Sequence, residues 1–134
     1  MTLQPDRDVK DYLIANIVSL SDSNVLVGPI EDKGNRSQNR VFVQNSGGPI
    51  PQRTMGRIGE LRSGFVNIFI RNKNWLNGRN LSDEIFELLS KLNSVSGYED
   101  VDLQQSTPTD IGVTEKDVFL FALTVRLRWN ASTV

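Results

Sequence analysis

Residues 118–129, VFLFALTVRLRW, decide the fold, because apolar side chains recur at every second position along the whole stretch. One face carries Phe119, Phe121, Leu123, Val125, Leu127 and Trp129, and the other carries Val118, Leu120, Ala122, Thr124, Arg126 and Arg128. A period of two is typical of a β-strand. At about 3.3 Å per residue this strand spans about 40 Å, whereas a domain of this length has a radius of gyration of about 14 Å. We therefore predict a strand that runs beyond its own core.

Six further elements are predicted upstream of this strand. Helices are expected over residues 6–20 and around the stripe Leu81, Ile85, Leu88, Leu89 and Leu92, and strands over residues 25–27, 40–44, 65–71 and 98–105. The second helix has two candidate starts, a cap at Asn80 or an upstream extension from Asn74. The order predicts an α+β fold in a single domain, residues 1–134, with a mostly antiparallel sheet of about four to five strands, two helices packed on one face and a long hairpin loop.

Residues 45–64 are predicted to form that long loop. Glycines and prolines recur at Gly47, Gly48, Pro49, Pro51, Gly56, Gly59 and Gly64, with Arg53, Arg57 and Arg62 between them. Connections of this length without regular structure tend to be functional or disordered. Residues 107–116 are expected to form a turn-rich connection, and residues 130–134 a flexible tail.

The composition excludes most enzyme classes. The chain has 134 residues and contains neither cysteine nor histidine, which excludes thiolate nucleophiles, Ser-His-Asp triads and zinc sites built on imidazole or thiolate. The acidic clusters around Asp83 and Asp100 match no ligand pattern, and no phosphate-binding glycine motif is present. No apolar run reaches the ~18 residues of a membrane span. We predict no metal, no cofactor, no membrane association and no enzymatic activity.

Charge is unevenly distributed along the chain. Residues 1–30 carry a net charge of -2, residues 31–80 a net charge of +6 and residues 81–134 a net charge of -5. Such segregation favours a molecule that docks one face onto the opposite face of a neighbour. Three interpretations of Arg53, Arg57 and Arg62 stay open: they keep the loop solvated, they dock against acidic residues of a neighbouring subunit, or they contact nucleic-acid phosphates.

The end of the 118–129 strand is a second candidate interface. Arg126 and Arg128 flank Trp129 there, and tryptophan and arginine are enriched in interface hot spots. Core packing is the alternative for Trp129. Asp100 and Asp102 share one face of their predicted strand and are expected to be exposed or to face a partner.

Four segments carry a resemblance to a known family. They are the helix of residues 8–20 with the following VLVGP (25–29), the strand VFV (41–43) leading into GGPIPQRTMG (47–56), the strand and helix of residues 65–92, and the closing FALTVRLR (121–128). Together they make the chain resemble the small tail-completion, or tail-terminator, proteins of long-tailed bacteriophages, including those labelled minor capsid proteins. The segment Gly-Gly-Pro-x-Pro-x-Arg is the most distinctive of the four.

The resemblance implies a structural virion protein. It implies a homo-oligomeric ring, commonly a hexamer, at the head-proximal end of the tail, assembled in the host cytoplasm. Such a ring stops polymerisation of the tail tube protein and joins the tube to the head-tail connector protein, while genomic DNA passes through without sequence-specific binding. Gly47, Gly48, Pro49 and Arg53 are carried over as a contact region, and the charge argument adds Arg57 and Arg62.

Other functions stay open. A tube protein, a baseplate component or a head-completion adaptor could be built from similar elements. Outside this group, the basic residues of 31–80 could serve a nucleic-acid-binding module, and the carboxylates a small enzyme.

Overall fold

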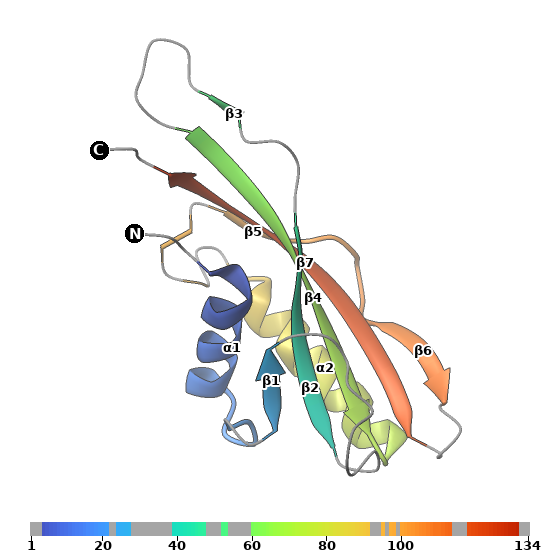
Figure 1. The fold of residues 1–134 in the computed structure, drawn as a ribbon. Helices are drawn as coiled ribbons and strands as arrows, with labels where there is room; N and C mark the ends of the chain where they lie inside the picture. The colour runs from blue at the N-terminus through green and yellow to red at the C-terminus, as the bar shows by residue number, and fades with distance from the viewer. Residues whose placement is uncertain are drawn as a thin grey trace.

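Two helices and seven strands form among the residues that the computed structural model describes, which are residues 4–21, 24–27, 39–47, 52–53, 60–91, 95, 97–98, 100–113 and 118–131. Their order along the chain is α1 (Pro5–Asn16), β1 (Val25–Val27), β2 (Arg40–Gly47), β3 (Gln52–Arg53), β4 (Glu60–Asn72), α2 (Trp75–Leu89), β5 (Asp100–Leu103), β6 (Thr109–Val113) and β7 (Phe119–Ala131). Figure 1 shows a twisted sheet with both helices on one side.

The sheet is built around β4 and β7. Its main path runs β1-β2-β4-β7-β5, while β3 pairs with β4 and β6 pairs with β7. Among the described residues, β1 and β2 form a parallel pair and all other pairs are antiparallel. The predicted α+β fold, a mostly antiparallel sheet with two helices on one face, is confirmed.

One face of the sheet forms the core with both helices. Along β4 the buried side chains are Val66, Ile68 and Ile70, and along β7 they are Phe121, Leu123, Val125 and Leu127, which are the alternate positions that the sequence predicted. Val9 and Leu13 of α1 and Ile85 and Leu89 of α2 pack onto this face and are fully buried. Burying each such side chain contributes about 1.5–3 kcal/mol, so the helix layer and the sheet stabilise each other.

Helix α1 is shorter than predicted. It ends at Asn16, and Ile17 is already extended. Ile17 and Leu20 are nevertheless buried, because a turn over Val18 and Ser19 brings Leu20 back to donate its backbone N–H to the Ile17 carbonyl at 3.1 Å. The helical spacing of Ile17 and Leu20 therefore reflected burial rather than a continued helix.

Helix α2 begins at the upstream of its two candidate starts. The Asn74 side chain caps it by accepting a hydrogen bond from the Asn77 N–H at 3.1 Å. Asn80 consequently lies inside the helix. The helix ends at Leu89, and Leu92 lies outside the described residues.

The predicted loop over residues 45–64 is wrong in extent. Residues 45–47 complete β2, residues 52–53 form β3, and residues 60–64 belong to β4, where β7 supplies backbone hydrogen-bond partners. Glycine does not prevent strand pairing here, because Gly64 pairs with Leu127 of β7 and is buried. A Cβ atom added at Gly64 would lie 3.4 Å from the Trp129 ring. Residues 48–51 and 54–59 lie outside the described residues.

Two other expectations need the same correction. Residues 109–113 of the predicted turn-rich connection form β6, which pairs with β7 across a bulge at Asp110 and Gly112. Residues 130–131 of the predicted tail continue β7 opposite residues 60–61. In both places strand pairing overrides a weak local preference.

Candidate interaction surface

Strands β4 and β7 form a ribbon that is longer than the layer of helices. Each strand has 13 residues, and they pair in an unbroken register from Glu60 and Ala131 to Asn72 and Phe119. At about 3.4 Å per residue the ribbon is about 44 Å long, whereas helices of 12 and 15 residues are about 18 and 22 Å long. Figure 1 shows the start of β4, the end of β7 and β3 extending past the N-terminal end of α1. The predicted strand that runs beyond its own core is present.

The opposite side of the sheet forms what we call the open face. Its central side chains are Phe65, Asn67 and Phe69 of β4 and Ala122, Thr124 and Arg126 of β7, all half-buried. In the part of the chain that the structure describes, both helices lie on the other side. Antiparallel sheets commonly leave one face uncovered, but aromatic and arginine side chains are also typical of interface cores.

Two arginine–aspartate pairs cross the open face. Arg126 donates to Asp102 at 2.8 Å, and Arg128 donates to Asp100. The register places each partner directly opposite, Asp102 beside Arg126 and Asp100 beside Arg128. Arg126 and Arg128 were predicted at an interface, and Asp100 and Asp102 to be exposed or to face a partner. The structure pairs each arginine with an aspartate of the same chain and leaves all four side chains partly exposed, and their contact with a neighbour stays a prediction.

These arginines keep some hydrogen-bonding capacity. The Nε atoms of Arg126 and Arg128 are buried and have no hydrogen-bond partner among the described residues. Each guanidinium binds its aspartate through a terminal nitrogen and remains about one-third exposed. These two pairs, which we call the arginine–aspartate ladder, are partly exposed, and each contributes about 0–1 kcal/mol.

Polar and aromatic contacts continue along the open face. The Thr124 hydroxyl donates to the Asn67 side-chain oxygen at 2.8 Å. Further along, the Arg71 guanidinium lies 5.3 Å above the centre of the buried Phe42 ring, a cation–π contact. At this end of the face both Arg71 and Phe42 are buried, so the exposed part of the face lies nearer its centre.

Trp129 packs within the subunit. Its ring meets the Tyr98 ring edge-on, with centroids 5.7 Å apart and an interplanar angle of 86°. It lies on the helix side of the sheet against the core, with Gly64 beneath it. Of the two interpretations of this residue, the structure shows core packing.

Gly47, Arg53 and Arg62, the other predicted site residues that the structure describes, belong to β2, β3 and β4. Gly47 ends β2 at a bulge with φ 80°, a conformation that favours glycine. Arg53 is on β3, whose backbone pairs with the start of β4, and Arg62 is on β4 opposite Trp129. Gly48, Pro49 and Arg57 lie outside the described residues. The structure thus gathers Arg53 and Arg62 near one end of the sheet.

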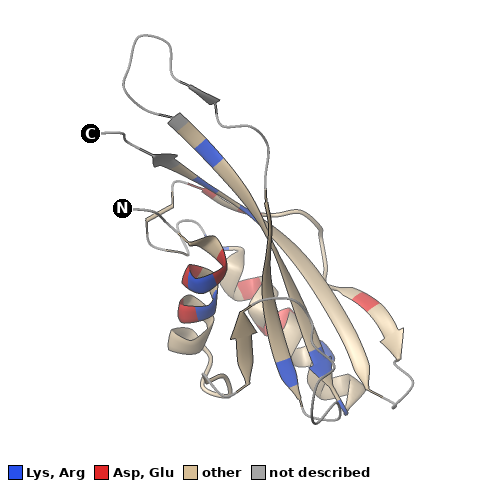
Figure 2. Cartoon of the chain, viewed as in Figure 1, with Lys and Arg blue, Asp and Glu red and all other residues tan. Residues whose placement is uncertain are grey.

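Both signs of charge occur on the helices and on the strands. Figure 2 shows blue as well as red residues on α1, and red as well as blue residues on the strands. The helices carry Asp6, Asp8, Asp11, Asp83, Glu84 and Glu87 with Arg7, Lys10 and Arg79, and the strands include Asp100, Asp102 and Asp110 with Arg40, Arg62, Arg71, Arg126 and Arg128. The helices therefore have an acidic surplus without being uniformly acidic.

Tyr98 connects the core to α1. Its hydroxyl donates to Asp8 at 2.5 Å. Burial, this hydrogen bond and the charges of Asp8 and Asp6 raise the pKa of Tyr98 far above its ordinary value. The tyrosine stays protonated, and its hydrogen bond to Asp8 joins it to α1.

An exposed apolar region at the start of α2 was not predicted as a site. Trp75 donates its indole N–H to Asp110 at 2.9 Å, and Arg79 lies 5.3 Å from the centre of the Trp75 ring. Leu76 on the same helix and Ile111 on β6 are more than half exposed. The sequence did not predict this contact, because Asp110 and Gly112 interrupt the alternation that would have indicated β6.

The described residues hold no group of three or more histidine, cysteine, aspartate or glutamate side chains that could bind a metal ion. Of the two helices described, neither is long and apolar enough to cross a membrane. A scan against protein-family models and a search of curated proteins both gave no match.

Proposed function

We propose that this chain is a structural subunit of a bacteriophage tail, which assembles into a ring at the head-proximal end of the tail tube and joins the tube to the head-tail connector. The paired ribbon of β4 and β7 is the observation that carries the proposal. It extends beyond the helices of its own subunit, so neighbouring subunits are the natural source of further contacts for it. The family resemblance of the four segments supports the same assignment.

The uneven distribution of charge along the chain supports a ring. A head-to-tail contact joins two different surfaces, and it closes into a ring when the rotation between copies closes. The exposed carboxylates Asp83, Glu84 and Glu87 of α2 on one copy would face basic residues of the next. In such a ring the DNA channel needs no base-reading site.

The experiment is the absolute mass of the purified protein by light scattering, over a range of concentrations and at two salt concentrations. We expect a discrete oligomer that weakens with salt, because screening shortens the Debye length from about 10 Å at 0.1 M to about 3 Å at 1 M. Electron microscopy of the same sample should show rings. Purified tail tubes that are still able to grow should stop growing when the protein is added.

A graded pair of variants tests the charge argument. Asp83 and Glu87 are exposed on α2. The change Asp83→Lys with Glu87→Lys should shift the equilibrium toward monomer at low salt, and Asp83→Asn with Glu87→Gln should shift it less. A chain that is monomeric in every condition, and that leaves tube growth unchanged, would contradict the proposal.

A nucleic-acid-binding module that uses the basic residues of 31–80 is the second candidate. DNA binding by a monomer that falls steeply between low and moderate salt would favour it over the ring.

A further inference from the structure

Asn77 and Gly78 form the only pair in the sequence in which glycine directly follows asparagine. Such a pair favours deamidation, because glycine has no side chain to hinder the approach of its backbone nitrogen to the side-chain carbonyl carbon of the asparagine. Asn77 lies in the first turn of α2 and is exposed. Position and sequence therefore make this pair a place where the chain can be chemically modified.

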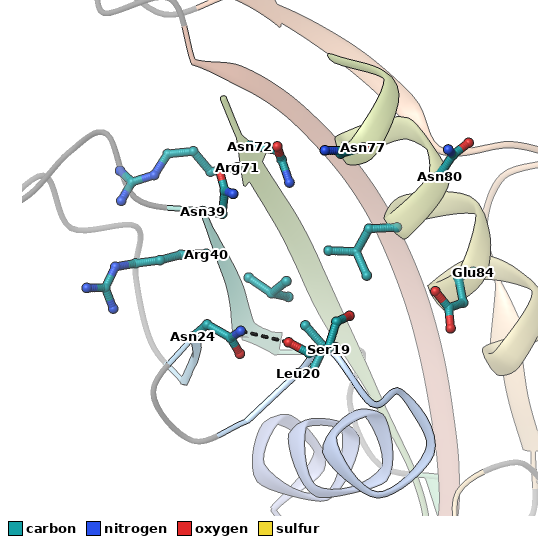
Figure 3. A pocket seen from close by; sticks show the side chains of 12 residues that line it. Ser19, Leu20, Asn24, Asn39, Arg40, Arg71, Asn72, Asn77, Asn80 and Glu84 are labelled. Atoms are coloured by element: carbon teal, nitrogen blue, oxygen red, sulfur yellow. Dashed lines mark hydrogen bonds between the residues drawn. The ribbon is translucent and has the colours of Figure 1, made fainter. Parts of the chain in front are cut away.

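Water has access to Asn77 from a cavity of about 330 Å³. The cavity opens between the turn that follows α1 and the first half of α2, and its lining is mostly polar. Figure 3 shows Asn77 on this wall beside Asn72, with Asn80 further along the helix. A polar cavity of this size has room for water molecules, so the water that hydrolysis requires is available at Asn77.

The closed helix protects the pair. The Gly78 N–H donates to the Asn74 carbonyl at 2.9 Å, so the nitrogen that would attack is already held in a helical hydrogen bond. The Asn74 side-chain oxygen also accepts from the Asn77 N–H at 3.1 Å. Attack requires the first of these bonds to open, and the second resists the same motion. Asn74 therefore controls both restraints.

The first turn has few buried contacts to lose when it opens. Trp75, Leu76 and Asn77 are exposed, and Gly78 is the first buried residue of α2. The side-chain bond from Trp75 to Asp110 lies at the surface. Segments with few buried contacts open at a lower free energy than the whole domain. The turn should therefore open while the rest of α2 stays packed.

We propose that Asn77 is a deamidation site whose rate is set by local opening of the first turn of α2. In the open form the Gly78 nitrogen loses its proton to solvent and attacks the Asn77 side-chain carbonyl carbon. The new carbon–nitrogen bond closes a succinimide ring while the bond to the side-chain nitrogen breaks, and that nitrogen takes up a proton and leaves as ammonia. Water then opens the ring at either carbonyl, which gives aspartate or isoaspartate. The net reaction consumes water and releases ammonia, and it goes beyond ring formation because it occurs within one chain.

The two products differ in their effect on α2. Aspartate leaves the main chain unchanged, and a carboxylate near a helix N-terminus is favourable. Isoaspartate adds a methylene group to the main chain directly before Gly78. Gly78 has little room to shift, because a Cβ atom there would already lie 2.7 Å from Cε2 of Phe121. The first turn should therefore form again in the aspartate product and not in the isoaspartate product.

The test is the rate of deamidation of the full chain at neutral pH, measured by mass spectrometry. Trypsin releases residues 74–79, because Lys73 and Arg79 flank the cleavage sites, and fragmentation of this peptide distinguishes Asn77 from Asn74. We expect Asn77 to react at least about tenfold more slowly in the folded chain than in the same chain unfolded in urea, since only the open fraction reacts. The ratio of the two rates gives that fraction, which should exceed the globally unfolded fraction obtained from urea unfolding.

Three variants locate the opening. Asn74→Ala removes the cap and should speed the reaction about fivefold, which corresponds to the ordinary contribution of a cap, about 1 kcal/mol. Asn74→Asp keeps the acceptor and should react at nearly the original rate. Ser90→Ala is the matched control, because it removes a side-chain hydrogen bond to the Glu87 carbonyl at the other end of α2, and it should leave the rate at Asn77 unchanged.

Each unfavourable result overturns the proposal. Equal rates in the folded and unfolded chains would show that the helix gives no protection. An open fraction no larger than the globally unfolded fraction would show that the first turn does not open by itself. An unchanged rate in folded Asn74→Ala, or an equal acceleration in Ser90→Ala, would exclude control by the first turn.

Discussion

The change Gly78→Ala should destabilise the protein, although helix propensity alone predicts the opposite. Gly78 is buried in the interior of α2. Alanine is favoured over glycine in a helix interior by about 1 kcal/mol. A methyl group at this position, however, would lie 2.7 Å from Cε2 of Phe121 and 3.0 Å from Cβ of Asn72.

The size of the effect follows from these distances. Carbon atoms pack favourably at about 3.5–4.0 Å, so the contact with Phe121 is too short by about 1 Å. Phe121 is only 2% exposed and is held in the core, and Asn72 Cβ belongs to a central strand, so neither neighbour can move aside easily. Overpacking costs about 1–3 kcal/mol, and this site belongs in the upper half of that range. After subtracting the gain in propensity, we expect a net loss of about 1–2 kcal/mol.

Urea unfolding measures the loss, which corresponds to a decrease in Tm of about 3–8 °C for a chain of this size. Asn80→Ala, at an exposed position of the same helix, is the control for propensity and should stabilise by about 0.5 kcal/mol. In a Phe121→Leu background the ring is absent, and Gly78→Ala should become neutral or stabilising. A stabilisation of about 1 kcal/mol in the original background would refute the argument from packing.

Two further predictions concern helix contacts. The pKa of Tyr98 is raised above its ordinary value of 10, so above pH 10 the folded state keeps a proton that the unfolded state loses. The stability that this group contributes is therefore complete below pH 10. Above pH 10 the free energy of unfolding falls by at most about 1.4 kcal/mol per pH unit. Urea unfolding between pH 9 and 11 should show a smaller decline in Tyr98→Phe, and equal slopes would count against the contact with Asp8. Asn74→Ala removes the cap of α2 and should cost about 1 kcal/mol, whereas Asn74→Asp, which keeps the acceptor, should restore most of it by the same assay.

The sequence predicted the elements whose pattern reflects burial on one face. The alternation over residues 118–129 and the stripe of leucines in α2 each correspond to side chains in the core. Strand β6 was missed because Gly112 has a φ of 115° at a bulge, so its alternation is broken. Strand β3 was missed because two residues carry no periodicity, and its pairing depends on β4 rather than on its own sequence.

The arginine–aspartate ladder shows what could have been inferred about the candidate surface. Asp100 and Asp102 are spaced by two residues, as are Arg126 and Arg128, so antiparallel pairing of their strands matches both pairs at once. The sequence analysis did not match these pairs, because the position of β5 beside β7 is a long-range property of the sheet. The cavity of about 330 Å³ beside Asn72 could not be predicted from the sequence either, because its lining residues come from four separate segments of the chain.

The position of β7 has a consequence for synthesis in the cell. It lies between β4 and β5 in the sheet and contributes four fully or almost fully buried core residues, Phe121, Leu123, Val125 and Leu127. Until residues 119–131 have left the ribosome, β4 lacks its longest partner and the apolar sides of both helices lack much of the surface they cover. Pairing of such distant segments is slow compared with local helix formation. From the synthesis of β4 until that of β7, the nascent chain therefore carries an apolar strand that is paired on one side at most, with β2, and that depends on a distant segment to complete its burial.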